Sequence, residues 1–275
     1  MTFFVIWASL IFMVGAAIGS FLNVCIARWP ANLSVVAPRS RCPRCERPIA
    51  WYENIPLVSW VALRARCRGC HLPISIQYPA VELGVALGWL IAFIAYPDPL
   101  TALRVAVFGT VLAGIAVTDL QHYVIPDGFT VFGLLWVVGT SFASFFMLRG
   151  STPFVDPYAA VLGACVGAGA ISIIGWLGEV VLKREAMGFG DVTLMAVVGA
   201  AVGPVGALLT IFIGAGLGAL TFAGVVLPIG WLRSRRNGTP FAAPLVPFGV
   251  FLAPAALVTL LSGHAMIDWY TSRLQ

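Results

Sequence analysis

Charged side chains are scarce in this sequence. Only 10% of its 275 residues are Asp, Glu, Lys or Arg, whereas 60% are hydrophobic and the mean hydropathy is +0.96. A soluble core of this size does not need apolar runs as long as those found here. The composition therefore excludes an ordinary soluble protein and predicts a chain that crosses a membrane several times.

The sequence also lacks the marks of a cleaved signal peptide. Its first 27 residues form an apolar run with no basic leader in front and no clear small-x-small cleavage site followed by a polar region. We therefore expect this run to be retained as the first membrane span. No low-complexity tract and no convincing internal repeat is apparent.

The apolar runs predict an all-α polytopic membrane protein with about eight transmembrane helices. The sixth run is short for a bilayer, which needs about 20 apolar residues per helix. Gly203-Pro204 breaks what would otherwise be one very long helix, which suggests local thinning or a water-accessible notch. The expected ranges are 4–27, 79–96, 101–121, 129–148, 157–182, 191–202, 204–232 and 244–263.

The basic residues predict the orientation of these helices. If the N-terminus lies outside the cytoplasm, only Arg104, Arg149 and Arg273 of the 16 Lys and Arg residues remain on the outer side. Both termini are then expected outside. The net charge of +5 is mostly explained by this topology and gives no support to nucleic-acid binding. The expected division is a first transmembrane helix at 1–27, a cytoplasmic zinc-binding loop domain at 28–78 and a transmembrane core at 79–275.

Four of the six cysteines fall in two CxxC pairs within the expected cytoplasmic loop. The pairs are Cys42 with Cys45 and Cys67 with Cys70. Two such pairs match the four-thiolate ligand set of tetrahedral zinc. Two disulfides are the alternative, but a reducing cytoplasm disfavours them. We predict a structural zinc site, because four sulfurs leave no position open for water.

Two aspartates are expected at the same membrane face. Asp119 lies at the cytoplasmic end of the third predicted helix, and Asp191 starts the sixth, after Gly188 and Gly190. Each alone has an ordinary explanation as a helix cap or a solvated interfacial residue. Together they match a carboxylate dyad, in which one member acts as an acid while the other activates water. The two glycines allow a substrate backbone to approach closely.

Several short segments occur in order along nearly the whole chain: GSFLNVCIARWP, the two CxxC pairs around WYENIPLVSW, ISIQYPAVEL, TDLQHYVIPD, GFGD and VPFGVFLAPAAL. Together they resemble the prepilin leader peptidases, also called type IV prepilin peptidases, which are GxGD-type aspartyl proteases of the bacterial inner membrane. GFGD alone is a weak pattern that is shared with presenilin-like proteases. The ordered combination is specific.

The resemblance implies that Asp119 and Asp191 are the catalytic pair and that Gly188 and Gly190 shape the active-site loop. The implied reaction is hydrolysis of one peptide bond at the cytoplasmic membrane face. The implied substrates are type IV prepilins and type II secretion pseudopilins, which are cut after the glycine that ends a short basic leader. Many members also methylate the new N-terminal amine with S-adenosylmethionine, so a bifunctional enzyme is expected.

Three further acidic residues are candidate contacts to a substrate or cofactor. Glu82 lies one turn into the second helix, where a carboxylate needs a partner, and Arg28 or a substrate amine are candidates. Glu53 can hydrogen-bond within the loop or contact the leader or the methyl donor. Asp127 is expected to cap the fourth helix, with a direct role as the alternative. His122 has no nucleophile beside it and is expected to be interfacial.

One position departs from the family pattern. After the second aspartate the family usually has a lysine in GxGDxKL, whereas this chain has Thr193. The missing cation beside Asp191 is expected to alter fine specificity and to leave the reaction in place.

Two other classes of function remain open. A small transporter can use Asp119 and Asp191 to bind a proton or cation, although both are expected at one face and not at the midplane. A noncatalytic platform for pilus assembly would need the zinc loop but not the aspartates. Asparagine substitutions at the two aspartates distinguish these classes from a peptidase.

Overall fold

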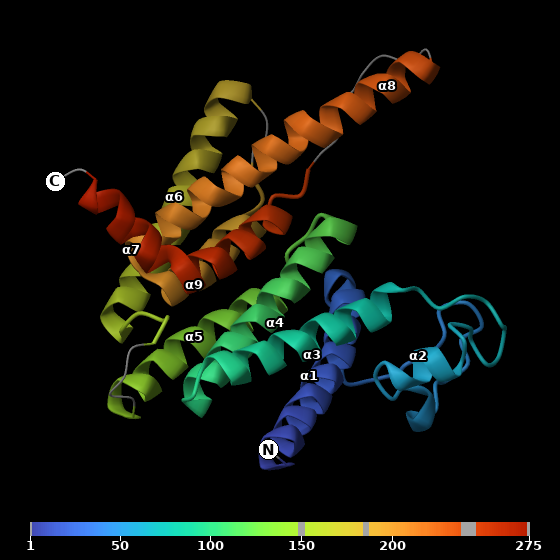
Figure 1. Cartoon of the computed structure of the whole chain (residues 1–275). Helices are drawn as coiled ribbons and strands as arrows, with labels where there is room; N and C mark the ends of the chain where they lie inside the picture. Colours follow the sequence, from blue (N-terminus) through green and yellow to red (C-terminus); the bar gives the residue numbers. More distant parts are fainter. Residues whose placement is uncertain (1, 148–151, 184–186, 238–245, 274–275) are drawn as a thin grey trace. The chain divides into compact units, whose positions relative to one another are not determined.

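The computed structural model describes residues 2–147, 152–183, 187–237 and 246–273 (Figure 1). Within these ranges the chain is helical and has no β-strand, with only two isolated β-bridges. The elements are α1 (Thr2–Arg28), η1 (Trp29–Ala31), η2 (Trp51–Glu53), α2 (Val58–Ala62), α3 (Gln77–Ala95), α4 (Pro99–His122), α5 (Asp127–Met147), α6 (Pro157–Leu182), α7 (Phe189–Thr221), η3 (Phe222–Val226), α8 (Leu227–Asn237) and α9 (Gly249–Ser272). The predicted all-α class is confirmed.

Seven helical segments among the described residues are long and apolar enough to cross a membrane. Many large apolar side chains on these helices are exposed, as lipid-facing surfaces require. The chain is therefore a polytopic membrane protein. The seven segments are one fewer than the eight predicted, because Phe189–Arg236 counts as one segment although the chain turns back within it.

The chain divides into two compact units, residues 1–114 and 115–275. The first unit contains α1, the cysteine loop, α3 and most of α4, and the second contains the end of α4 and everything after it. This division is based on contacts between residues, and its boundary differs from the limits of the three predicted domains. The three-domain division therefore stays a prediction.

In the first unit, α1 and α3 pack together in antiparallel directions. A Cβ added at Gly15 would lie 2.8 Å from the Cα of Ala86, and one added at Gly19 would lie 2.7 Å from the Cα of Glu82. Two glycines one turn apart thus bring the two backbones into close contact, as is common between membrane helices. This close approach places Glu82 of α3 beside Gly19 of α1.

In the second unit, α7 is folded into two arms at Gly203. This residue has φ 76° and ψ 179°, a conformation essentially restricted to glycine, and it is followed by Pro204, which has no N–H to donate. The first arm, Phe189 to Val202, packs antiparallel to α6, because Gly163 meets Gly199 and Gly167 meets Met195.

The second arm of α7, Pro204 to Thr221, packs antiparallel to α9. Gly206 lies beside Thr259 and Gly214 lies beside Leu252. The first arm and α9 begin at the same end of the unit, so the two arms of α7 run in opposite directions. The predicted break at Gly203 is therefore confirmed, and it separates the sixth and seventh predicted helices.

The first arm is short. Its 14 residues rise about 21 Å at about 1.5 Å per residue, whereas the hydrocarbon core of a bilayer is about 30 Å thick. A membrane segment of this length leaves its end below the surface plane or thins the bilayer locally. Asp191 lies in the first turn of this arm.

Several predicted limits need correction. The last helix runs to Ser272, well beyond the predicted end at 263, and the predicted seventh helix continues through η3 and α8 to Asn237. Residues 148 and 244–245 of the predicted helices, together with Arg149 and Arg184, lie outside the described residues.

Candidate functional site

Asp119 is held near the end of α4 by the start of α9. Its side chain is buried, at 5% exposure, and its Oδ2 accepts a hydrogen bond from the main-chain N–H of Val250 at 3.2 Å. Gly249 lets the two helices approach, because a Cβ added there would lie 2.8 Å from Asp119 Oδ2. The free N–H groups of a helix N-terminus are suited to a carboxylate, since they carry partial positive charge.

Asp191 is brought to the same place from α7. Gly188 is the N-cap of the helix, and the main-chain N–H of Asp191 donates to the Gly188 carbonyl at 3.1 Å. Gly190 packs against Ile125, since a Cβ added at Gly190 would lie 2.8 Å from the Cβ of Ile125. The half-buried Asp191 carboxylate lies close enough to Asp119 for their charges to interact.

Ile125 packs against the helix starts that lie beside the two aspartates. It is buried at 8% exposure in the short link between α4 and α5, and it contacts Gly190 at the start of α7 and Gly249 at the start of α9. Three segments distant in sequence thus meet around one isoleucine. Neither Ile125 nor Gly249 was singled out from the sequence.

Thr193, which stands where the family pattern usually has a lysine, hydrogen-bonds within its own helix. Its hydroxyl donates to the Gly190 carbonyl oxygen at 3.0 Å. Asp127 and His122 are both exposed, Asp127 in the first turn of α5 and His122 in the last turn of α4. A carboxylate in the first turn of a helix interacts favourably with the helix dipole. This position favours a structural role for Asp127 at the start of α5.

The four cysteines of the two CxxC pairs form one cluster in the first unit. The Sγ atoms of Cys42, Cys45, Cys67 and Cys70 all lie within 4.8 Å of one another, and those of Cys42 and Cys70 are 3.9 Å apart. Sulfurs at about 2.3 Å from a tetrahedral zinc are about 3.8 Å apart, so the spacing fits this ion. The cluster can bind a metal ion.

The peptide groups around Cys67 favour its thiolate, whereas at Cys70 the Leu72 N–H is outweighed by burial and the neighbouring cysteine side chains, which raise the pKa of Cys70 to about 11. The N–H groups of Cys70 and Gly69 lower the pKa of Cys67 to about 6, and the N–H of Gly69 lies 3.4 Å from its Sγ. Metal ions bind the thiolate and not the thiol. The donor set therefore fits the predicted structural site.

The two knuckles are copies of one turn. In each, the first cysteine receives a main-chain hydrogen bond from the residue four positions on, Glu46 to Cys42 and His71 to Cys67, both at 2.9 Å. Glu46 and His71 share a φ of 56°. The sequences RCPRCERPI and RCRGCHLPI, 25 residues apart, carry this repeat, so the expectation of no convincing repeat was wrong.

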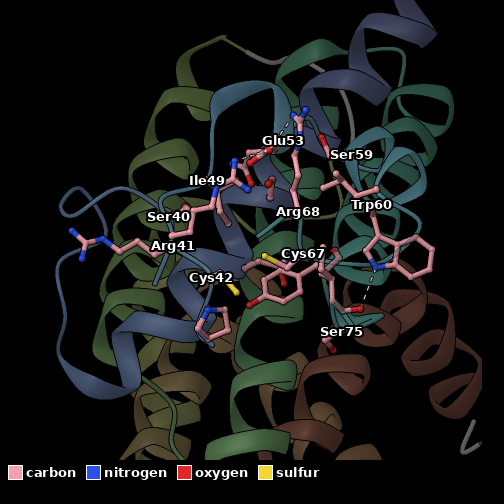
Figure 2. Close-up of a pocket in the computed structure, with 18 of the residues that line it drawn as sticks. Ser40, Arg41, Cys42, Ile49, Glu53, Ser59, Trp60, Cys67, Arg68 and Ser75 are labelled. Carbon is pink, nitrogen blue, oxygen red and sulfur yellow. Dashed lines mark hydrogen bonds and ion pairs between the residues drawn. The ribbon is translucent and has the colours of Figure 1, made fainter. Parts of the chain in front are cut away.

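Glu53 joins the two knuckles. Its Oε1 accepts hydrogen bonds from Arg47 at 3.0 Å and from Arg68 at 3.4 Å, one arginine from each knuckle. Its side chain is only 6% exposed. Figure 2 shows Glu53 and Arg68. Burial raises the pKa of Glu53, but the hydrogen bonds from Arg47 and the Ala50 N–H outweigh it and hold the pKa below its ordinary value. This geometry favours the loop-bonding interpretation.

Glu82 also has a partner in the loop. It is 8% exposed, and its Oε2 accepts a hydrogen bond from the main-chain N–H of Leu57 at 2.8 Å. The suggested pairing with Arg28 is wrong, because the Arg28 guanidinium donates to the carbonyls of Ser34 at 2.8 Å and Pro38 at 2.7 Å. The carboxylate thus ties α3 to the loop that carries the knuckles.

The helical membrane bundle and the two aspartates gathered at helix ends fit the peptidase class that the sequence predicted. Comparison with known proteins is consistent with that class. A family model described as the type IV leader peptidase family matches residues 106–223, and one described as the bacterial peptidase A24 N-terminal domain matches residues 13–96.

Three curated relatives extend the comparison. A prepilin leader peptidase/N-methyltransferase of Aeromonas salmonicida is 33% identical over 98% of this chain and 95% of its own length. One of Myxococcus xanthus is 43% identical over 71% of this chain, which covers 56% of that protein. A type 4 prepilin-like proteins leader peptide-processing enzyme of Escherichia coli O78:H11 is 38% identical over 69% of this chain and 75% of its own length. No solved structure matches.

The chain belongs to the type IV leader peptidase family. The resemblance predicted from the motifs is confirmed, and the comparisons support the peptidase prediction over the transporter alternative.

Proposed function

We propose that this chain is a membrane aspartyl endopeptidase that removes the leader of type IV prepilins and type II secretion pseudopilins and then N-methylates the new terminus. The observation that carries the peptidase proposal is the meeting of Asp119 and Asp191 at the starts of α7 and α9. Membership of the family supports the same reaction.

The two carboxyl groups are proposed to share the acid and base roles. Two like charges close together in apolar surroundings favour a state with one proton between them. The protonated carboxyl polarises the scissile carbonyl, and the ionised one takes a proton from water as the water attacks. The roles then exchange, and a proton passes to the leaving amine.

The α9 N-terminus is proposed to orient Asp119 for this work. The Val250 N–H occupies one lone pair of Oδ2 and so restricts rotation of the carboxyl group. A main-chain N–H cannot move away from the carboxylate unless the helix moves, so the orientation of the Asp119 carboxyl group is set before substrate binds. Gly188 and Gly190 are proposed to leave room for the extended substrate backbone around its leader glycine.

The four cysteines are proposed to hold a structural zinc ion that links the two knuckles, since no ligand position is left for water. S-adenosylmethionine is proposed as the methyl donor, and when bound it supplies an electrophilic methyl group to the new amine. Glu53, Glu82 and Asp127 are not assigned to the peptide cleavage.

The proposed location is the bacterial inner membrane, with both termini outside and the aspartates at the cytoplasmic face. The distribution of Lys and Arg supports this orientation. The cysteine cluster requires a reducing compartment to remain free for a metal, which agrees with a cytoplasmic loop.

The test is cleavage of a purified prepilin in liposomes by the full chain and by the Asp119→Asn and Asp191→Asn variants. Product masses are read by mass spectrometry with S-adenosylmethionine present. Asp268→Asn is the matched control, because Asp268 is exposed near the end of α9. We expect both dyad variants to lose at least 10³-fold in rate, as removal of a principal catalytic group does.

The outcomes separate the parts of the proposal. Cleavage after the leader glycine by the wild type and the control alone supports the dyad, and an added methyl mass supports the second activity. Cleavage by folded Asp119→Asn and Asp191→Asn at the wild-type rate would show that the aspartates are structural.

A further inference from the structure

Four large apolar side chains are exposed next to the two aspartates in the second unit. Leu120 follows Asp119 in the last turn of α4, Tyr123 and Val124 lie in the link from α4 to α5, and Phe189 is the first residue of α7. We call these four side chains the apolar rim. None of them takes part in the proposed proton transfers, so their exposure beside the dyad needs another explanation.

The link and the start of α7 lie side by side where Gly190 packs on Ile125. A Cβ added at Gly190 would lie 2.8 Å from the Ile125 Cβ and 3.4 Å from the Ile125 carbonyl oxygen. Val124 directly precedes Ile125, and Phe189 directly precedes Gly190. Consecutive Cα atoms are only about 3.8 Å apart, so both members of the rim flank this one contact. Asp191 is the next residue after Gly190, which places the rim beside the dyad.

Tyr123 has an unfavourable main-chain conformation. Its φ is 55°, in the left-handed region, and its N–H donates to the Asp119 carbonyl at 2.9 Å at the end of α4. Glycine or asparagine suits such a helix end, because a bulky side chain is strained there. Residues held in strained conformations gather at functional sites. Since the ring is exposed, packing within the described part of the unit does not explain why a tyrosine stands here.

Phe212 shows how an ordinary lipid-facing ring is placed on the same helix. It is 80% exposed in the second arm of α7, and Phe189 is 76% exposed at the start of the first arm. Contact with lipid is made by side chains such as Phe212 along regular helix faces. The rim differs, because it combines a helix end, an irregular link with a strained tyrosine and the first residue of another helix.

The absence of charge in the rim decides which part of a substrate it can hold. None of its four side chains is charged, and an apolar surface is unsuited to the basic leader, whose charges would lose water there. The segment on the other side of the scissile bond is then the part that contacts the rim. An extended chain advances about 3.3 Å per residue, so the first three residues after the leader glycine lie within about 10 Å of the dyad.

We propose that the apolar rim, chiefly the rings of Tyr123 and Phe189, binds apolar side chains in the first residues after the leader glycine and so sets substrate specificity. This inference rests on the proposed peptidase function and adds the residues that recognise the substrate next to the scissile bond. Burial of apolar surface on the rim holds these residues extended across the dyad. The two rings supply large contact areas from side chains with few rotatable bonds.

The test is cleavage in liposomes of a type IV prepilin and of the same prepilin with serine at the three positions after the leader glycine. Phe189→Ala removes one ring of the rim, and Tyr123→Gly removes the other. Glycine also relieves the strained main chain at position 123, so this variant should stay folded. Phe212→Ala is the matched control, because it removes an equally exposed ring from the second arm of α7. A melting curve on each protein reports whether it is folded.

We expect each rim variant to raise KM for the unaltered prepilin about tenfold and to change kcat little, because a contact made equally in the ground and transition states is lost. The wild type should cut the serine substrate with a kcat/KM at least tenfold lower, and this preference should shrink in both rim variants. Phe212→Ala should keep the wild-type KM and the wild-type preference.

Three results would overturn the inference. A wild-type KM in both folded rim variants would assign their rings to lipid contact, and equal cutting of the two prepilins by the wild type would show that the rim reads nothing. A loss confined to kcat with the preference intact would indicate a disturbed dyad. Cleavage after the leader glycine by the wild type leaves the proposed function standing in all three cases, whereas a wild type that cuts neither prepilin would refute the proposed function and this inference together.

Discussion

Gly249→Ala tests how closely the start of α9 controls the Asp119 carboxylate. A Cβ at this position would lie 2.8 Å from Asp119 Oδ2 and 3.0 Å from the Cδ1 of Ile125. Ordinary van der Waals contact begins at 3.4 Å, so the carboxylate or the helix must move by the difference of 0.6 Å. The 3.2 Å hydrogen bond from Val250 would be strained or lost by such a shift.

The expected consequence is a loss of rate with the fold retained. A misplacement of about 1 Å can cost about 10²-fold in rate, so a shift of 0.6 Å should lower kcat about 10- to 100-fold. KM should change little, because the substitution adds a methyl group next to a carboxyl group and not on the proposed path of the leader. The assay is prepilin cleavage in liposomes under saturating and limiting substrate.

Two further variants make this prediction specific. Gly216→Ala introduces the same methyl group in α7 where nothing lies within 4 Å, and it should cleave at the wild-type rate. Ile125→Val combined with Gly249→Ala removes Cδ1 and relieves one of the two contacts, so it should recover part of the lost rate. If folded Gly249→Ala cleaves as fast as Gly216→Ala, the start of α9 does not position Asp119.

Three other predictions concern the fold and the cysteine cluster. Gly203→Ala should destabilise the second unit by about 1–3 kcal/mol, because its φ of 76° with ψ of 179° is open essentially to glycine alone, and a lowered melting temperature measures this against Gly216→Ala. Cys67→Ser should abolish stoichiometric zinc in metal analysis of the purified chain, whereas Cys165→Ser, an exposed cysteine of α6, should retain it. The pKa of Glu53 is held below its ordinary value, so its contribution to stability is complete above the unfolded-state pKa and is lost as the pH falls through the folded-state pKa. Glu53→Gln should therefore lower the melting temperature near neutral pH, and its melting temperature should fall less on acidification than that of the wild type. The same pH dependence of the melting temperature in both proteins would contradict this.

Much of the architecture was accessible from the sequence alone. Long apolar runs predicted the membrane helices, and Gly203-Pro204 predicted the break within α7, since both features act over a few neighbouring residues. The two CxxC pairs predicted a four-sulfur cluster because the ligand spacing of a knuckle is a local property. The repeat of the knuckles was equally local and was missed, although the shared R-C-x-x-C-x-x-P-I pattern carries it.

Other features depended on where distant segments meet. The donor to Asp119 comes from Val250, 131 residues away, and Ile125 receives both Gly190 and Gly249. Tyr123 reads as one aromatic residue near a helix end, and only its main-chain conformation and the packing of Gly190 on Ile125 place it in a strained position beside the dyad. The sequence by itself determined where the main membrane helices lie, apart from several of their ends, and which residues can ionise or bind a metal. Only the tertiary structure decided which of those groups share a site, because their contacts depend on the packing of several helices at once, and no local pattern of residues encodes that distance.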